Sequence, residues 1–108
     1  MQIENQLDDK ARQKLEGLVS SSKVVLFMKG TKSAPQCGFS DAVVKTLNAL
    51  GVDYLTYDVL TDLDIRQGMK VYSEWATFPQ LYINKEFVGG CDIVMEMYQS
   101  GELQKLLK

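Results

Sequence analysis

The chain has 108 residues, of which 45% are hydrophobic and 24% charged, and its net charge is −2. These values are typical of one globular domain, here residues 1–108, whether that domain is a whole protein or was cut from a longer one. Nucleic acid is not an expected partner because no polybasic run occurs. No membrane is expected either, since no apolar run approaches the ~20 residues of a membrane span.

Targeting signals and histidine are both missing from the sequence. The N-terminus resembles neither a signal peptide nor an Arg-rich transit peptide, so we expect a cytoplasmic protein, with nuclear or processed organellar forms left open. The lack of histidine excludes a histidine general base, a Ser-His triad and a histidine-ligated zinc site. The two cysteines, Cys37 and Cys91, are too few for a disulfide-stapled scaffold, and one chain cannot supply four thiolates to a cluster.

The first half of the chain alternates helix and strand signals. An N-terminal helix within residues 1–21 is predicted by apolar residues at helical spacing, namely Leu7, Ala11, Leu15 and Leu18. The apolar run Val24–Met28 predicts a buried strand, and a loop follows from Lys29 to Gln36. A second helix is predicted from Phe39 to Leu50, with Gly51 as its stop.

The second half begins with a strand and a helix. Val52–Val59 predicts a second strand, and Thr61–Asp64 resembles a capping box that opens a helix. A hairpin is then predicted from strands at Gln80–Ile83 and Glu86–Val88, with Asn84-Lys85 as its turn. Lys85 occupies a turn position where glycine would be better.

The C-terminal part is predicted to be helical. After Gly89-Gly90 ends the sheet, we expect Asp92 to cap a helix, which Ser100-Gly101 interrupts before a last helical piece. The resulting order, α-β-α-β-α-β-β-α-α, indicates an α/β domain. A parallel strand pair and an antiparallel hairpin then form a four-stranded mixed sheet with helices on both faces.

Cys37 lies where a loop after a strand meets the start of a helix. The helix dipole, the free N–H groups of the first turn and the charges of Lys29 and Lys32 are expected to lower its pKa. A buried, inert cysteine is the alternative. The tetrad Cys37-Gly38-Phe39-Ser40 has no second cysteine, so an internal C-x-x-C disulfide cycle is excluded, and the Ser40 hydroxyl is expected to bond within the first helical turn.

Other segments carry weaker signals, each with an ordinary structural alternative. A cis bond before Pro79 would free the Phe78 backbone to pair with an extended peptide, although trans is the commoner form. Arg66 and Lys70 share a helix face and could bind a carboxylate, or they could simply be solvated. Gly89–Asp92 brings the backbone close to a helix N-terminus, which suits an anion, but Cys91 is more often a packing residue. Trp75 and Tyr72 are expected to pack.

Taken together, these segments closely resemble the C-G-F-S class of monothiol glutaredoxins over roughly residues 20–107. The matching stretches are Met28-Lys29-Gly30-Thr31, Pro35-Gln36-Cys37-Gly38-Phe39-Ser40, Ile65-Arg66-Gln67-Gly68-Met69-Lys70, Thr77-Phe78-Pro79-Gln80-Leu81-Tyr82 and Val88-Gly89-Gly90-Cys91-Asp92-Ile93. The sequence departs from the usual family pattern at Lys32, Ala76 and Lys85. Lys32 would add charge near the site.

The resemblance implies a thioredoxin-like fold, a cis peptide before Pro79 and a site that binds glutathione. Its glutathione-binding residues would be Lys29, Cys37, Phe39, Arg66, Lys70, Phe78, Pro79, Cys91 and Asp92. Cys37 would also be the catalytic thiol and the ligand of a [2Fe-2S] cluster. That cluster would bridge two chains with the thiols of two glutathiones, so that the protein would be a homodimer when loaded and a monomer when apo.

Three functions therefore remain open at this point. The first, which the resemblance favours, is an iron–sulfur carrier that serves apo iron–sulfur proteins or iron regulators and has weak or no oxidoreductase activity. The second is a glutathione-dependent thiol–disulfide oxidoreductase that uses Cys37 alone. In the third, Cys91 would act as a resolving thiol for oxidised Cys37.

Overall fold

The computed structural model describes residues 7–108, so the first part of the predicted N-terminal helix lies outside the described residues. Its elements in chain order are α1 (Asp9–Val19), β1 (Val24–Met28), β2 (Gly30–Thr31), β3 (Ala34–Pro35), α2 (Gly38–Ala49), β4 (Leu55–Asp58), α3 (Leu63–Ser73), β5 (Gln80–Ile83), β6 (Glu86–Gly89), α4 (Cys91–Ser100) and α5 (Glu102–Leu106). The predicted order of the main elements is confirmed. In the part of the chain that is described, no helix is long and apolar enough to cross a membrane.

The central sheet has the strand order β4-β1-β5-β6. β1 runs parallel to β4, in a register that pairs Val25 with Leu55, and antiparallel to β5. β5 and β6 form the predicted antiparallel hairpin. The mixed four-stranded sheet expected from the sequence is therefore confirmed.

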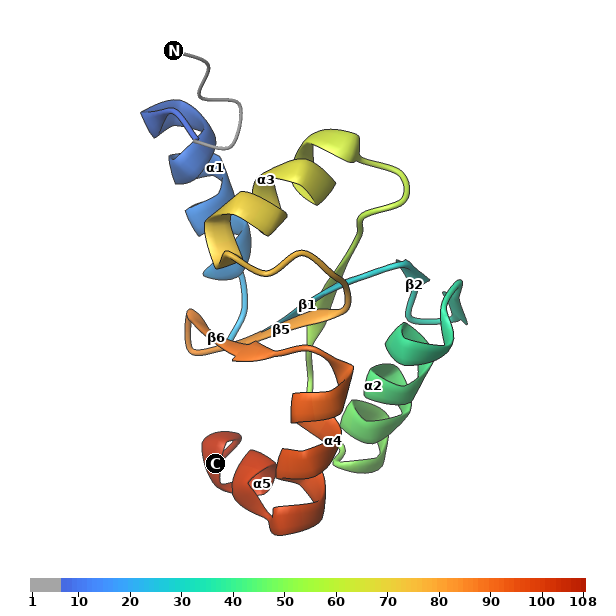
Figure 1. The fold of residues 1–108 in the computed structure, drawn as a ribbon. Coiled ribbons are helices and arrows are strands. Elements are labelled where there is room, and N and C mark those ends of the chain that lie inside the picture. The colour runs from blue at the N-terminus through green and yellow to red at the C-terminus, as the bar shows by residue number, and fades with distance from the viewer. Residues whose placement is uncertain (1–6) are drawn as a thin grey trace.

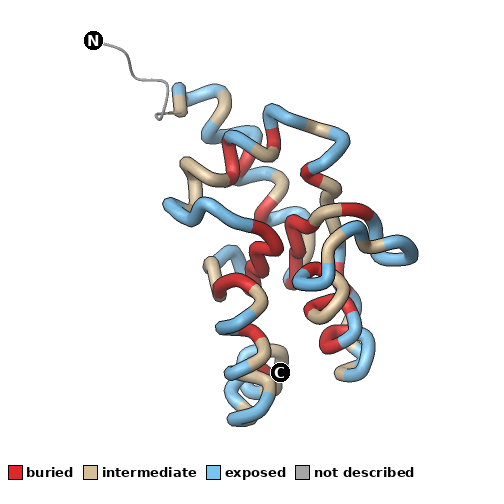
Figure 2. Tube along the Cα trace, turned by 45° about the vertical axis from the view of Figure 1, so that its right-hand side comes forward, coloured by how far each residue is buried: buried red, intermediate tan, exposed pale blue. Residues whose placement is uncertain are grey.

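Helices cover both faces of this sheet (Figure 1). The side chains of β1 alternate between two separate cores, as the two-residue period of a strand requires. Val24, Leu26 and Met28 pack with residues of α2, α4 and α5, whereas Val25 and Phe27 pack with residues of α1 and α3. Figure 2 shows the resulting buried segments in the middle of the molecule. β1 is thus buried on both sides and serves as the rigid centre from which the neighbouring loops extend.

One predicted loop and one predicted strand differ in extent from the structure, and the predicted hairpin turn has an unusual backbone. The predicted loop 29–36 contains a small antiparallel ribbon in which Gly30 pairs with Pro35 and Thr31 with Ala34. β4 is shorter than the predicted strand 52–59, because β1 offers pairing partners only from Leu55 to Asp58. The hairpin turn places both Asn84 and Lys85 at positive φ, 52° and 70°, so Lys85 adopts the backbone conformation in which glycine would be easier.

Two predicted helix caps are wrong. The cap of α3 is Asp62, whose carboxylate accepts a hydrogen bond from the Ile65 N–H at 3.0 Å, so the box does not start at Thr61. The cap of α4 is Gly90, so Asp92 lies inside the first turn. α4 can start this early because Gly89 has a φ of 151° and no Cβ, which would otherwise lie 2.8 Å from the Cβ of Ile93.

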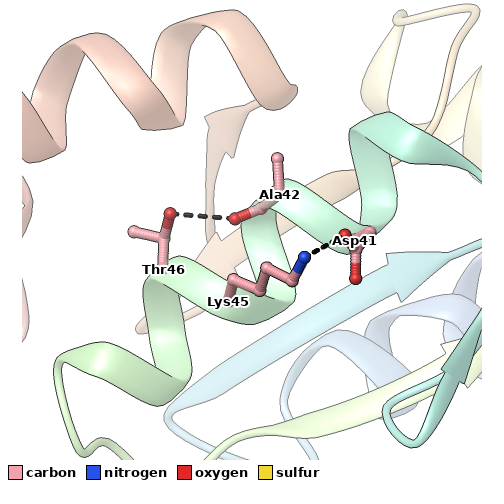
Figure 3. Close-up of polar contacts among 4 residues, drawn as sticks. All are labelled: Asp41, Ala42, Lys45 and Thr46. Atoms are coloured by element: carbon pink, nitrogen blue, oxygen red, sulfur yellow. Dashed lines mark hydrogen bonds and ion pairs between the residues drawn. The ribbon is translucent and has the colours of Figure 1, made fainter.

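α2, which begins next to Cys37, is tied to α4 by packing and by one side chain. The Thr46 hydroxyl donates to the Ala42 carbonyl at 2.9 Å, and its oxygen lies 3.2 Å from Met95 Sδ on α4. Lys45 and Asp41 form an exposed ion pair at 2.9 Å (Figure 3). Because both partners are solvated, this pair adds little stability. The position of α2 therefore depends on its buried face.

Candidate functional site

An open cleft of about 550 Å³ lies at one end of the sheet. Three segments form it: the end of β1 with the start of α2, the loop between α3 and β5, and the junction of β6 with α4. The cleft brings together most of the predicted site residues, which are Lys29, Cys37, Phe39, Phe78, Pro79, Cys91 and Asp92. Arg66 and Lys70 lie on α3 and are not among the residues that line it.

Cys37 is the N-cap residue of α2 and is partly exposed. Its side chain lines the cleft, where a bound molecule could reach the sulfur. Burial raises the pKa of the thiol, but the backbone N–H groups of Ser40 and Phe39, the charge of Lys29 and the Ser40 hydroxyl together lower it below its ordinary value. The predicted activation of Cys37 is thus supported, and the alternative of a buried, inert cysteine is not.

Ser40 holds the start of α2 against the end of β1. Its side chain is fully buried, and its oxygen accepts a hydrogen bond from the Lys29 N–H at 3.1 Å. The Ser40 hydroxyl thus joins two contacts: it bonds to Cys37 within the first helical turn, as expected, and it accepts from the backbone just after β1. This bond keeps Lys29 close to Cys37, while the Ser40 proton remains available to the thiolate.

Lys32 does not contribute charge to the site, contrary to the prediction. Its ammonium donates to the carbonyl oxygen of Tyr54 and lies 4.0 Å from the centroid of the Tyr54 ring. The cation–π contact explains why the Lys32 side chain extends to Tyr54, because the ring attracts the ammonium. Of the two lysines expected near Cys37, only Lys29 lowers its pKa.

A second wall of the cleft is the start of α4. The cap residue is Gly90, and no side chain caps the first turn of α4. The N–H groups of that turn are therefore open to a ligand. Burial, together with the charges of Asp92 and Cys37, raises the pKa of the Cys91 thiol. Cys37 and Cys91 line the same cleft and are both free thiols.

The third wall is the loop between α3 and β5. The peptide bond between Phe78 and Pro79 is cis, as the resemblance implied. Trp75 packs against Phe87 with ring centroids 5.7 Å apart, which confirms that it packs, but it also lines the cleft. A Cβ on Gly90 would lie 3.3 Å from both the Pro79 carbonyl oxygen and Trp75 Nε1, so the loop and α4 approach closely at this glycine.

A family model and several known proteins match this chain. The glutaredoxin family model matches residues 24–88. A ycf64-like monothiol glutaredoxin of Synechocystis sp. is 54% identical over 102 residues, which cover 94% of this chain and 95% of the relative. The mitochondrial monothiol glutaredoxin-5 of Lachancea kluyveri is 55% identical over 105 residues, covering 94% of this chain and 73% of the relative. The chain belongs to the monothiol glutaredoxin family.

Solved glutaredoxin structures confirm the thioredoxin-like fold. A monomeric truncated mutant of Trypanosoma brucei 1-C-Grx1 is similar with a TM-score of 0.81 and 44% identity, over 89% of this chain and 87% of that one. A buckwheat glutaredoxin–glutathione complex is similar with a TM-score of 0.79 and 32% identity, over 91% and 87% of the two chains. The monothiol class agrees with Ser40, which leaves Cys37 without a partner cysteine in its helical turn.

Several residues of this glutaredoxin site were not predicted as site residues. Trp75, Thr77 and Ile93 line the cleft. The only feature of the sequence that could have identified them is that they lie close to the predicted site residues Phe78, Pro79 and Asp92. Gly90 was expected to allow close approach, and its contacts agree. Arg66 does not line the cleft, and its Nε is buried without a hydrogen-bond partner among the residues described.

Proposed function

We propose that this glutaredoxin binds glutathione in the cleft beside Cys37. The residues that line the cleft include Cys37 and the start of α4, where free N–H groups suit a carboxylate. Cys91 and Asp92 would hold the γ-glutamyl end there, with Phe39 and Pro79 against the body of the peptide. The Phe78 backbone would pair with its cysteinyl residue. Lys29, Arg66 and Lys70 would face its carboxylates.

The cargo that this arrangement suits best is a [2Fe-2S] cluster. Cys37 offers one thiolate at the edge of the cleft, and glutathione beside it would offer a second. A cluster needs four such ligands, so two chains and two glutathiones complete the set. No group of three or more Cys, Asp or Glu side chains comes together among residues 7–108 to hold a metal ion. We therefore propose a monomer without cluster and a homodimer with it.

The proposed activity is transfer of the cluster to apo iron–sulfur proteins or iron regulators. The single observation that carries it is the Cys37 site itself: a partly exposed thiol of lowered pKa with Ser40 in place of a second cysteine. Such a thiolate is a good ligand. Without a resolving thiol in the same turn, it has no internal disulfide that would compete with the metal.

Anaerobic reconstitution tests this proposal. The protein is incubated with iron, sulfide and glutathione, and absorption and molecular mass are then measured together. A dimer with thiolate-to-iron absorption is expected, and Cys37→Ser should abolish it while Cys91→Ser should keep its [2Fe-2S] absorption. Failure of the wild-type chain to hold a cluster in the presence of glutathione would refute the proposed cargo.

A second candidate is reduction of glutathionylated proteins, favoured by the same lowered pKa of Cys37. The Cys37 thiolate would attack the glutathionyl sulfur and release the protein substrate as a thiolate. A second glutathione thiolate would then attack the Cys37–glutathione disulfide, yielding oxidised glutathione and free Cys37. Rapid turnover of a small glutathione mixed disulfide would support this function, and we expect weak turnover at best.

The compartment is also part of the proposal. We propose a cytoplasmic location. The printed names of two relatives place those proteins in mitochondria and in chloroplasts. Imaging of the tagged chain in its own cell would decide the location here.

A further inference from the structure

The loop between α3 and β5 is fixed by a side chain that never reaches the cleft. Gln80, the first residue of β5, is fully buried. Its amide nitrogen donates to the Trp75 carbonyl at 3.0 Å and to the Thr77 carbonyl at 3.3 Å. Both acceptors belong to residues that line the cleft. One buried carboxamide therefore holds two backbone positions of the cleft wall.

The orientation of this carboxamide follows from its partners. Because both are carbonyl oxygens, the NH₂ group must face the loop. The Gln80 oxygen is then buried without a hydrogen-bond partner in residues 7–108. An unpaired buried amide oxygen is unfavourable, and the next three positions of the strand, Leu81, Tyr82 and Ile83, are all apolar or aromatic. A glutamine at this place serves the loop rather than the core.

Trp75 is held from a second direction as well. Its backbone N–H donates to the Lys70 carbonyl at 3.2 Å and to the Ser73 hydroxyl oxygen at 3.1 Å, and that hydroxyl donates to the Met69 carbonyl at 2.7 Å. Gln80 fixes the Trp75 carbonyl, and the indole ring lies against Phe87 and the backbone of Gly90. The loop is thus joined to α3, to β5 and to the opposite wall of the cleft.

We propose that Gln80 is a positioning residue for the ligand of this cleft. By holding the Trp75 and Thr77 carbonyls, it keeps the loop in its bound shape before a ligand arrives, which removes the cost of ordering the loop on binding. The role rests on the proposed binding of glutathione. On this proposal, part of the affinity for glutathione depends on Gln80, a buried residue that does not contact the ligand.

Gln80→Met tests this role, because methionine fills a similar volume and cannot donate to the loop. Trp75 is the only tryptophan of the chain, so its fluorescence reports on the loop without a label. We expect about tenfold weaker binding of reduced glutathione, followed by Trp75 emission, because two backbone bonds to the wall are lost. Trp75 anisotropy should also fall, while the pH profile of Cys37 alkylation should stay as in the wild type.

Tyr82→Phe is the matched control. Tyr82 lies two residues away on the same strand and face, and its buried hydroxyl lies near Ser73 but makes no hydrogen bond to the loop carbonyls that Gln80 holds. Its removal should leave glutathione affinity and Trp75 anisotropy unchanged. If it weakens binding as much as Gln80→Met does, any change in this part of the core weakens the site, and the specific role of Gln80 is refuted.

Gln80→Glu provides a second variant should the methionine protein not fold. An ionised glutamate repels both carbonyls, whereas a protonated one can donate to one of them, so its affinity relative to the wild type should recover as pH falls. Equal affinity and anisotropy in the wild type and both Gln80 variants would overturn the role of Gln80 alone. Absence of glutathione binding by the wild type would instead overturn the proposed function together with this role.

Discussion

The two cysteines of this glutaredoxin stand in nearly the same backbone setting and behave differently. Cys37 precedes α2 as its cap, Cys91 is the first residue of α4, and both line one cleft. Yet the pKa of Cys37 is lowered and that of Cys91 is raised. A helix N-terminus alone is therefore not enough to activate a thiol.

The groups around each sulfur explain why the two thiols differ in pKa. Around Cys37, burial is outweighed by the first-turn N–H groups, Lys29 and the Ser40 hydroxyl. Around Cys91, burial acts in the same direction as the carboxylate of Asp92 and the neighbouring Cys37. The first-turn N–H groups that contact the Cys37 sulfur, followed by the charge of Lys29, therefore give one thiol of lowered pKa, whereas Cys91 has no such donors and keeps a raised pKa.

The largest expected effect is on adduct formation with oxidised glutathione. Cys37→Ser should abolish the adduct of one glutathione per chain, because the remaining thiol has a raised pKa. Cys91→Ser should keep the adduct. Intact-protein mass spectrometry measures both, and a persistent adduct in Cys37→Ser would show that Cys91 is reactive after all.

Removing the charge next to each cysteine should bring the alkylation rates of the two thiols closer together. Lys29→Gln removes a charge that lowers the pKa of Cys37 and should slow its alkylation at neutral pH by roughly threefold. Asp92→Asn removes a charge that raises the pKa of Cys91 and should speed the alkylation of that residue. Peptide-level mass spectrometry after timed iodoacetamide treatment gives both rates. Unchanged rates would mean that the hydrogen bonds of each helix end dominate.

Ser40→Ala should combine a modest loss of stability with a less reactive Cys37. The Lys29 N–H would lose its acceptor, at a cost of about 1 kcal/mol in the free energy of unfolding. The thiolate would also lose the Ser40 hydroxyl as a donor. Urea denaturation measures the first effect and alkylation the second. Ser33→Ala is the surface control, since Ser33 is exposed and contacts only the Thr31 hydroxyl.

The smallest effect concerns stability at alkaline pH. The lowered pKa of Cys37 stabilises the fold above the pKa of an unfolded thiol, and this contribution is lost as pH falls through the folded value. The raised pKa of Cys91 acts in the opposite sense: its contribution is present below the unfolded pKa and is lost as pH rises. Denaturation at neutral and at alkaline pH should therefore show Cys37→Ser losing relative stability on alkalinisation and Cys91→Ser gaining it. If alkaline pH changed the relative stability of both variants in the same direction, the opposite pKa shifts of Cys37 and Cys91 would be contradicted.

Much of the fold follows from local sequence because the elements are strongly patterned. The all-apolar run of β1 and the helical spacing of Ala11, Leu15 and Leu18 in α1 each leave one reasonable choice, although Leu7, which shares that spacing, lies before the helix. The β2–β3 ribbon was missed because two-residue strands have no period to detect. The early start of α4 was missed because Asp92 is a good cap residue in isolation, and only the close packing of Gly89 on Ile93 excludes the later start.

The site was predictable where chemistry is local and not where it depends on three-dimensional contacts. Lys29 and Cys37 could be assigned from a strand, a loop and a helix start. The direction of Lys32 depends on Tyr54, which is distant in sequence. Gln80 gave no signal of its own, because its partners are backbone carbonyls of a loop without periodicity.

The most direct test of the account is a pH profile of alkylation in which both cysteines are followed in one wild-type sample. Isotope-labelled iodoacetamide and peptide mass spectrometry give a midpoint for each thiol under identical conditions. We predict a midpoint for Cys37 below that of an ordinary cysteine thiol and one for Cys91 above it. Coincident midpoints, or a lower one for Cys91, would contradict the assignment of Cys37 as the working thiol.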